Sequence, residues 1–136
     1  MRRSLTREER LRSGREIGGV FRHGATYECR GMILKVRPNE VGRSRIVVTP
    51  PRKAGSAVVR NRLRRIGKEV YRTQKELFAP GYDCAIIIFP GEYSFEERKE
   101  QLRALFRRAG LLKPDVASES RPSEAQPSTG TRDIND

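Results

Sequence analysis

The spacing of apolar residues along the chain predicts helices and strands in mixed order. Near the N-terminus three apolar residues recur at helical offsets, namely Ile17, Val20 and Phe21. Ser13 and Glu16 have the spacing of a capping box, and Gly24 supplies a stop. The pattern therefore predicts a short helix at about residues 14–23.

Three strands are predicted further along. Met32, Leu34 and Val36 alternate with the residues between them, which is typical of a half-buried strand. A polar turn separates this strand from a second one over residues 45–49, which two prolines end because neither can donate to a strand ladder. The unbroken apolar run DCAIIIFPG predicts a fully buried third strand.

A long helix is predicted over residues 57–78, between the second and third strands. At about 100° per residue, one arc of this helix collects its apolar side chains: Val59, Leu63, Ile66, Val70 and Leu77. Another arc collects Arg60, Asn61, Arg64, Arg65, Lys68, Arg72 and Lys75, with Arg62 nearer the boundary. The helix is thus expected to turn an apolar face to the core and a cationic stripe away from it.

The chain is predicted to form one domain, residues 1–113, followed by a tail. A last helix is expected between Ser94 and Gly110, with one apolar face: Phe95, Leu102, Leu105, Phe106 and Ala109. Residues 114–136 are rich in Ser, Pro and Glu and hold almost no large apolar residue. Such a composition cannot offset the entropy of ordering, so we expect a disordered tail that is solvated or folds back on a basic face.

Charge indicates the class of partner. The chain has 29 Lys and Arg against 17 Asp and Glu, a net charge of +12, and residues 1–113 hold 27 of the cations and 12 of the anions. Nucleic acid is favoured because cations that neutralise phosphates release condensed counterions. An anionic membrane surface is the competitor, but it would require a basic amphipathic helix with Trp, Phe or Leu opposite the charges. The chain has no Trp, and its apolar residues are spread over several elements.

The cationic stripe carries the strongest functional signal. Arg60, Arg64 and Lys68 are like charges at i,i+4, which costs a few tenths of a kcal/mol per pair, about 0.2–0.5. Arg52 and Lys53 stand before the helix N-terminus, where cations oppose the macrodipole. A bound phosphate would resolve both conflicts, whereas a solvated surface helix would leave them. Asn61 could bond a base edge, a sugar or nearby backbone.

The remaining chemistry is sparse. Cys29 and Cys84 have no metal-ligand spacing and are interpreted as core or free thiols in a reducing compartment. The N-terminus lacks the apolar core of a signal peptide and no long apolar run follows, so we expect a cytoplasmic protein. His23 is the sole histidine. Intrinsic catalysis by paired acids, a metal cluster or an activated nucleophile is therefore not expected.

At this point the residues resemble a known family. The segment RKAGSAVVRNRLRRIGKEVYR is similar to the arginine-rich signature of bacterial ribonuclease P protein components. RLRSGREIGGVFRHG resembles the first helix of that family, YDCAIIIFPG its strand after the long helix, and SFEERKEQLRALFRRAGLL its last helix. The resemblance covers about residues 7–112 in order.

The resemblance implies a protein subunit that assists RNA-catalysed removal of the 5′ leader from precursor tRNA. The implied partners are the catalytic RNA and the precursor, with no membrane or small-molecule cofactor, and Mg²⁺ is held mainly by the RNA and the substrate. No catalytic or metal-ligating residue is expected on the protein. The residues implied to bind RNA are Arg52, Lys53, Arg60, Asn61, Arg62, Arg64, Arg65, Lys68 and Arg72, and those implied to line a leader cleft between the first helix and the sheet are Ile17, Phe21 and Lys35.

The resemblance also implies a fold, an α/β (α+β) two-layer sandwich of about four strands in a mixed sheet and three helices. Its crossover around the long helix is left-handed, against the general rule for such connections. Ile17 and Lys35 stand where the family often has aromatic residues, so leader contact here is expected to be more electrostatic.

The rival function is a structural RNA-binding protein of ribosomal or RNA-chaperone type without a role in cleavage.

Overall fold

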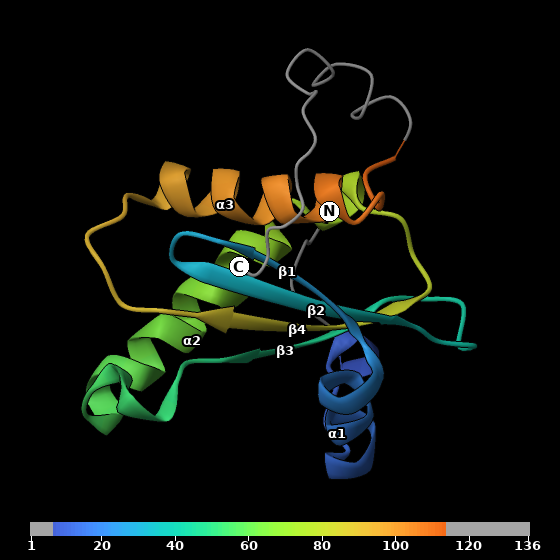
Figure 1. Cartoon of the computed structure of the whole chain (residues 1–136), viewed down its shortest axis with the longest axis horizontal. Coiled ribbons are helices and arrows are strands. Elements are labelled where there is room, and N and C mark those ends of the chain that lie inside the picture. The colour runs from blue at the N-terminus through green and yellow to red at the C-terminus, as the bar shows by residue number, and fades with distance from the viewer. Residues whose placement is uncertain (1–6, 114–136) are drawn as a thin grey trace.

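The computed structural model describes residues 7–113 (Figure 1), so the expected tail lies outside the described residues. These residues form three α-helices: α1 (Gly14–His23), α2 (Ala57–Arg72) and α3 (Phe95–Arg108). Four strands form one sheet: β1 (Ala25–Cys29), β2 (Met32–Pro38), β3 (Arg45–Thr49) and β4 (Tyr82–Ile88). Short 3-10 helices lie at Arg7–Glu9 (η1), Arg52–Ala54 (η2) and Lys75–Leu77 (η3).

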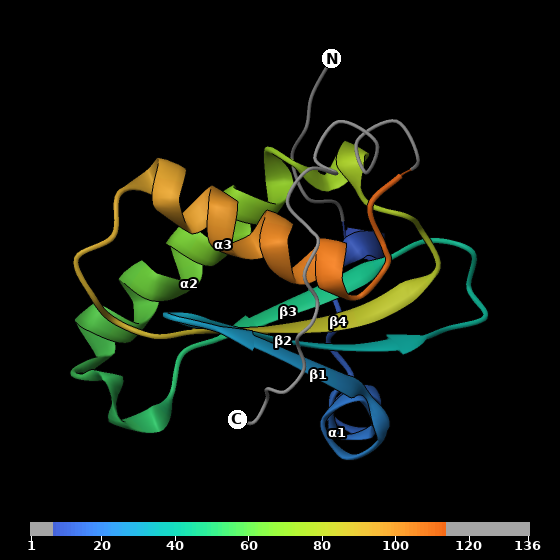
Figure 2. The same cartoon turned by 45° about the horizontal axis from the view of Figure 1, so that its top comes forward.

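The sheet is mixed, with strand order β1-β2-β4-β3. β2 pairs antiparallel with both β1 and β4, whereas β3 and β4 run parallel. Parallel neighbours require a crossover, and α2 supplies it in the left-handed sense (Figures 1 and 2). The expected mixed α/β fold with its unusual crossover is confirmed.

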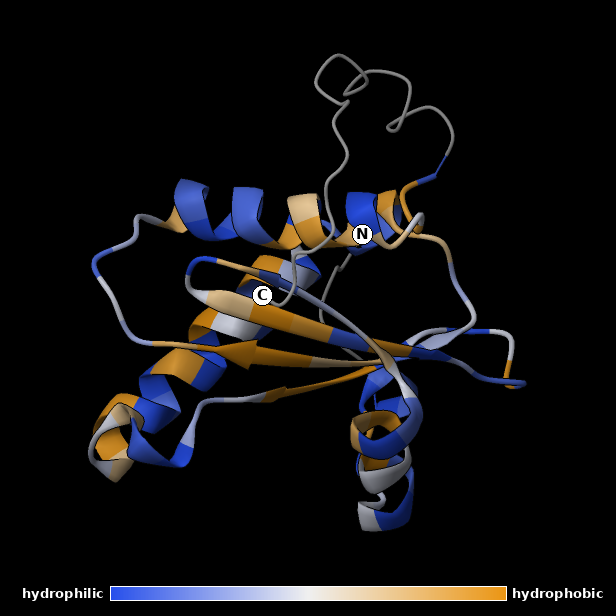
Figure 3. Ribbon diagram, in the orientation of Figure 1, coloured by the Kyte–Doolittle hydropathy of each residue, from blue (hydrophilic) through white to orange (hydrophobic). Residues whose placement is uncertain are grey.

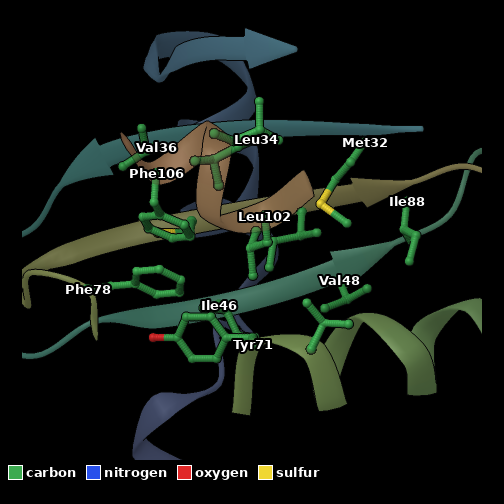
Figure 4. Packing of buried hydrophobic residues seen from close by; sticks show 14 of the residues in the cluster. Met32, Leu34, Val36, Ile46, Val48, Tyr71, Phe78, Ile88, Leu102 and Phe106 are labelled. Atoms are coloured by element: carbon green, nitrogen blue, oxygen red, sulfur yellow. The ribbon is translucent and has the colours of Figure 1, made fainter. Parts of the chain in front are cut away.

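The main core lies between one face of the sheet and the helices α2 and α3. Figure 3 shows hydrophobic colour along the strands and hydrophilic colour on the outer sides of α2 and α3. The residues that close this core include Met32, Leu34, Ile88, Leu102 and Phe106 (Figure 4). The ring of Phe106 stacks on Phe78 with 3.8 Å between ring centroids.

The opposite face of the sheet is covered only in part, by α1. Val20 of α1 and Leu11 pack against Ala85 of β4, with Ile17 and Val47 at the edge of this smaller cluster. Ser13 caps α1 as expected, because its hydroxyl accepts from the backbone N–H of Glu16 at 3.3 Å. The predicted bounds of this helix are confirmed. Among the described residues, none of the other helices covers the stretch of the sheet beside α1.

The long helix ends earlier than predicted. α2 stops at Arg72 rather than continuing to residue 78, and Leu77 lies in η3. The Thr73 hydroxyl donates to the carbonyls of Glu69 and Val70, and the buried Gln74 side chain donates to the carbonyls of Val70 and Lys99. These side chains occupy acceptors at the helix end, which favours termination there.

Two further differences concern the last helix. Phe95 was expected on its apolar face but is exposed at the helix start, with the Lys99 ammonium 5.9 Å from its ring centroid. Arg98, which does not belong to the predicted apolar face, is only 2 % exposed. Its guanidinium donates to the carbonyls of Gly31 and Phe89 and therefore ties α3 to the β1–β2 turn and the end of β4.

Candidate nucleic-acid interface

The inward side of α2 holds the helix against the sheet. Leu63 and Val70 are buried, and Gly67 faces Val48 of β3. Ser56 caps the helix, since its hydroxyl accepts from the backbone N–H of Val59 at 3.3 Å. The predicted core face is therefore confirmed for the part of the sequence that is helical, and it fixes which side chains point outward.

The outward side of α2 is cationic and exposed. Arg62, Arg65 and Lys68 are exposed, and within residues 7–113 their side chains have no hydrogen-bond or ion-pair partner. Arg52 and Lys53 of η2 are likewise exposed and without a partner in this range. Five positive charges of the predicted site therefore face solvent and can meet an anion without first breaking a contact.

Three other predicted residues make contacts within the helix region. Arg60 donates to the carbonyl of Gly55 at 2.7 Å, which holds its guanidinium near the start of α2. Arg64 donates to the side-chain oxygen of Asn61 at 2.8 Å. The side-chain oxygen of Asn61 is therefore occupied by Arg64, and Asn61 itself is exposed.

Arg72 differs from the rest of the stripe because it is paired with an acid. Its Nε donates to Oε2 of Glu69 at 3.1 Å, one turn earlier in α2. The hydrogen bond from Arg72 lowers the pKa of Glu69 below its ordinary value. Arg72 therefore carries a partly compensated charge, and we expect it to contribute least to anion binding among the predicted residues.

The three residues predicted to line a leader cleft lie together where α1 meets the sheet. Phe21 is 38 % exposed, and the Lys35 ammonium lies 5.8 Å from its ring centroid. Lys35 also donates to the Thr26 hydroxyl at 2.9 Å, which fixes the ammonium beside the ring. Ile17 is half-buried on the same side of α1. The proximity of Phe21 and Lys35 is observed, while the contact of all three residues with RNA stays a prediction.

Sequence reasoning did not identify the ion pair that positions α1. Arg45 at the start of β3 donates Nε and Nη2 to the two carboxylate oxygens of Asp83 in β4, at 2.9 and 2.8 Å. The hydrogen bond to Asp83 raises the pKa of Arg45 above its ordinary value. Arg45 also reaches Glu16 of α1 at 3.3 Å. The charge of Arg45 is therefore compensated by acids inside the fold.

Sequence reasoning also missed a group of arginines before α1. Arg7, Arg10 and Arg12 lie beside Arg43 and Arg45 around a shallow hollow. The signal was present in the sequence, because three like charges within six residues precede a helix cap, but nothing local indicated that the chain brings them to the start of β3.

The two cysteines, the other candidate reactive groups, are held in the protonated form at neutral pH. Cys29 and Cys84 are free thiols, and burial raises their pKa values to about 11 and about 12. Within residues 7–113 no group of three or more His, Cys, Asp or Glu side chains comes together as a metal site would require. None of the helices in this range is long and apolar enough to cross a membrane.

The amino-acid sequence matches those of known proteins over most of its length. A model of the family described as Ribonuclease P matches residues 5–110. The chain is 33% identical over 115 residues to the ribonuclease P protein component of Dictyoglomus thermophilum, which covers 81% of this chain and 95% of that protein. It is 38% identical over 84 residues to the corresponding component of Petrotoga mobilis, covering 62% of this chain and 71% of that one.

A solved structure is similar to this chain in both fold and sequence. The ribonuclease P protein of Thermotoga maritima superposes with a TM-score of 0.67 at 28% sequence identity, covering 74% of this chain and 96% of that one. The matched region holds the basic helix α2, the left-handed crossover and the partly covered face beside α1. The chain therefore belongs to the family of ribonuclease P protein components.

Proposed function

We propose that this protein binds the catalytic RNA of ribonuclease P through the outward side of α2 and the 5′ leader of precursor tRNA through the surface beside α1. The observation that carries the first part is the set of exposed cations on α2 and η2 that have no partner in the described chain. Each such cation that neutralises a phosphate releases counterions, and the affinity gained falls as salt rises.

The lead-in to α2 fits a phosphate in particular. Arg52 and Lys53 lie just before the first turn of α2. The backbone N–H groups of a first turn point out of the N-terminal end of the helix, toward the preceding residues. Helix N-terminal N–H groups and nearby cations together favour an anion. We therefore expect the catalytic RNA backbone to run along this end of α2 and continue past Arg62 and Arg65.

The leader would use different chemistry. Phe21 offers an exposed ring on which an unpaired base can stack, and Lys35 places an ammonium beside that ring. Ile17, the third residue predicted there, adds apolar surface without a ring. A short single strand could thus be held by one stacked base and by phosphate contacts, with no dependence on a particular base edge.

Catalysis is proposed to belong to the RNA. Mg²⁺ bound by the RNA and the precursor would activate the attacking water and stabilise the leaving oxygen. The protein residues would act by binding alone, bringing the precursor and the catalytic RNA together and offsetting phosphate repulsion at low Mg²⁺. No side chain of the protein is assigned a proton transfer or a nucleophilic role.

Reconstitution tests this function directly. The purified protein, the catalytic RNA and a labelled precursor tRNA are mixed at a Mg²⁺ concentration too low for the RNA alone. We expect the protein to increase the rate of 5′ leader release, and a double variant Arg62→Ala, Arg65→Ala to require more protein for the same rate. A protein that binds the RNA but leaves cleavage unchanged would instead be a structural RNA binder.

A further inference from the structure

A second basic surface lies at the opposite end of β3 from the lead-in to α2. A hollow of about 290 Å³ opens there between the segment before α1, the start of β3 and the β2–β3 loop. Five arginines line it, which we call the arginine pocket: Arg7, Arg10, Arg12, Arg43 and Arg45. Glu8 and Glu16 are the acids of the lining, so the lining side chains have a net charge of +3.

The backbone around the pocket is fixed to the sheet. Leu11 is buried, and its N–H donates to the carbonyl of Ile46 at 2.7 Å, beside a parallel bridge between Arg10 and Ile46. Arg43 donates from Nε to the carbonyl of Glu8 at 3.1 Å, which joins the β2–β3 loop to η1. The arginines are therefore held around the hollow by structured segments on two sides.

The acids near the pocket are largely used by one arginine. Arg45 is bonded to both oxygens of Asp83 and reaches Glu16, and its side chain is only 15% exposed. Lys75, another cation near η1, is paired with Glu9 at 3.0 Å. These acids therefore compensate the charges of Arg45 and Lys75.

Three arginines of the pocket keep an uncompensated charge. The side chains of Arg7, Arg10 and Arg12 are exposed and have no hydrogen-bond or ion-pair partner within residues 7–113. Like charges gathered on a fixed backbone repel one another and oppose folding. The planar guanidinium fork matches the oxygens of a phosphate bidentately, and so an anion of this kind removes the repulsion and uses the donors.

We propose that the arginine pocket binds a phosphodiester group of RNA, as a contact separate from the outward side of α2. This inference rests on the RNA-binding function proposed above and adds a second site to it. Arg45 and Thr49 stand at the two ends of β3, about 13 Å apart at the usual rise per residue. One structured RNA can therefore engage both sites at once, which raises affinity beyond that of either site.

The test compares charge-matched variants. Arg10→Ala, Arg12→Ala removes two pocket charges that have no partner within the described chain. Arg30→Ala, Lys113→Ala removes two exposed charges from other parts of the chain, and Arg62→Ala, Arg65→Ala reports on α2. Affinity is measured as a function of salt concentration in two arms. The first arm measures binding of the protein to the catalytic RNA alone. The second compares the binding of leader-bearing precursor and of mature tRNA to the assembled holoenzyme.

We expect the pocket variant to lose about five- to eight-fold in affinity at 0.1 M salt for each phosphate contact, with a shallower salt slope. A loss in the first arm assigns the phosphate to the catalytic RNA, and a loss confined to leader-bearing precursor assigns it to the leader. If the pocket variant behaves as the control while the α2 variant weakens binding, the pocket inference is overturned and the proposed function stands. If neither variant differs from the control, the proposed function fails with it.

Protein stability is checked alongside. The side chains of the two pocket arginines make no hydrogen bond or ion pair within the described residues, and so the melting temperature should stay the same or rise as repulsion is removed. If the double variant melts lower, the single variant Arg12→Gln is measured in the same two arms. An unchanged affinity and salt slope in that variant would likewise overturn the inference.

Discussion

Gly67 of α2 lies directly against Val48 of β3, so closely that a Cβ atom added at Gly67 would stand 2.5 Å from Cγ1 of Val48. A glycine in the middle of a helix costs about 0.8–1 kcal/mol relative to alanine. Here the missing side chain allows α2 to sit close to the edge strand of the sheet. The contact places the outward side of α2, and the cations on it, at a fixed distance from the sheet.

Replacing Gly67 with alanine should therefore destabilise the protein, although alanine is the better helix former. Val48 is β-branched and stiff within the strand, so relief of the clash would require a backbone shift that costs about 1–3 kcal/mol. We expect a net loss of about 1 kcal/mol or more in the free energy of unfolding, measured by urea denaturation.

Gly14→Ala is the matched control for that experiment, because no atom lies within 4 Å of a Cβ added at this first residue of α1. This variant should be neutral or slightly stabilising. Adding Val48→Ala to Gly67→Ala should recover part of the loss as a coupling energy. Equal stability of the Gly67→Ala variant and the wild type would show that α2 does not depend on this close approach.

Arg98 should be the most sensitive cation of the protein to substitution. It is buried and has no carboxylate partner within residues 7–113. It donates to the carbonyls of Gly31 and Phe89 and to the side-chain oxygen of Gln101. Arg98→Ala would remove a donor from each of these acceptors, and a buried acceptor left without any donor costs about 1–3 kcal/mol. The Gly31 carbonyl would keep the N–H of Phe89 at 3.1 Å. Arg98→Lys should also destabilise the protein, because a single ammonium group cannot reach all three acceptors.

Thermal unfolding of these variants beside Arg30→Ala measures the effect. Arg30 is exposed at the β1–β2 turn, and its removal should change the stability by less than about 0.5 kcal/mol. If Arg98→Lys melted with the wild type, the three carbonyl and amide contacts would not be structural.

The two thiols should make stability fall at high pH. Burial raises the pKa of Cys29 to about 11 and that of Cys84 to about 12, whereas the ordinary value is 9.0. Above pH 9 the unfolded chain releases these protons and the folded chain retains them. The folded state then binds more protons, so the free energy of unfolding decreases as pH rises from about 9 toward 11.

Alkylation with iodoacetamide at pH 8 gives an independent measure. Only the thiolate reacts, so both thiols should react much more slowly in the folded protein than in urea. Cys84→Ala should remove part of the stability loss between pH 9 and 11. Equal alkylation rates with and without urea would contradict the assigned burial.

Ile17→Phe should strengthen contact with the leader. Ile17 lies on the same side of α1 as Phe21, and a second ring there could stack on a further unpaired base, a contact worth about 1–3 kcal/mol in other single-strand binders. The expected result is tighter binding of leader-bearing precursor to the holoenzyme with no change for mature tRNA. Equal changes for both RNAs would remove this position from the leader site.

The elements that sequence periodicity predicted are those whose own residues decide their conformation. α1, β2, β3 and β4 have strong apolar periodicity or clear stop signals, and they stand close to where the pattern placed them. β1 (Ala25–Cys29) was not recognised, because it is a short edge strand with three polar or small residues and is organised mainly by pairing with β2. The handedness of the crossover came from the family resemblance, since general rules favour the opposite hand.

For the site, the arc of cations on α2 was predictable because a regular helix fixes the relative directions of its side chains. The partners of those cations were not predictable in the same way. Arg72 with Glu69 is a local pair, but Arg45 with Asp83 and the buried Arg98 depend on segments far apart in sequence. Net charge alone could not distinguish arginines used inside the fold from those left for RNA.

The most direct test of the central claim is the salt dependence of binding between the protein and the catalytic RNA. The slope of log affinity against log salt is negative for a protein that binds phosphates. We expect Arg62→Ala, Arg65→Ala to make it shallower by about one to two units. The charge-matched Arg30→Ala, Lys113→Ala control should keep the wild-type slope. Identical slopes for the wild type and the α2 variant would contradict the claim that this helix side contacts RNA phosphates.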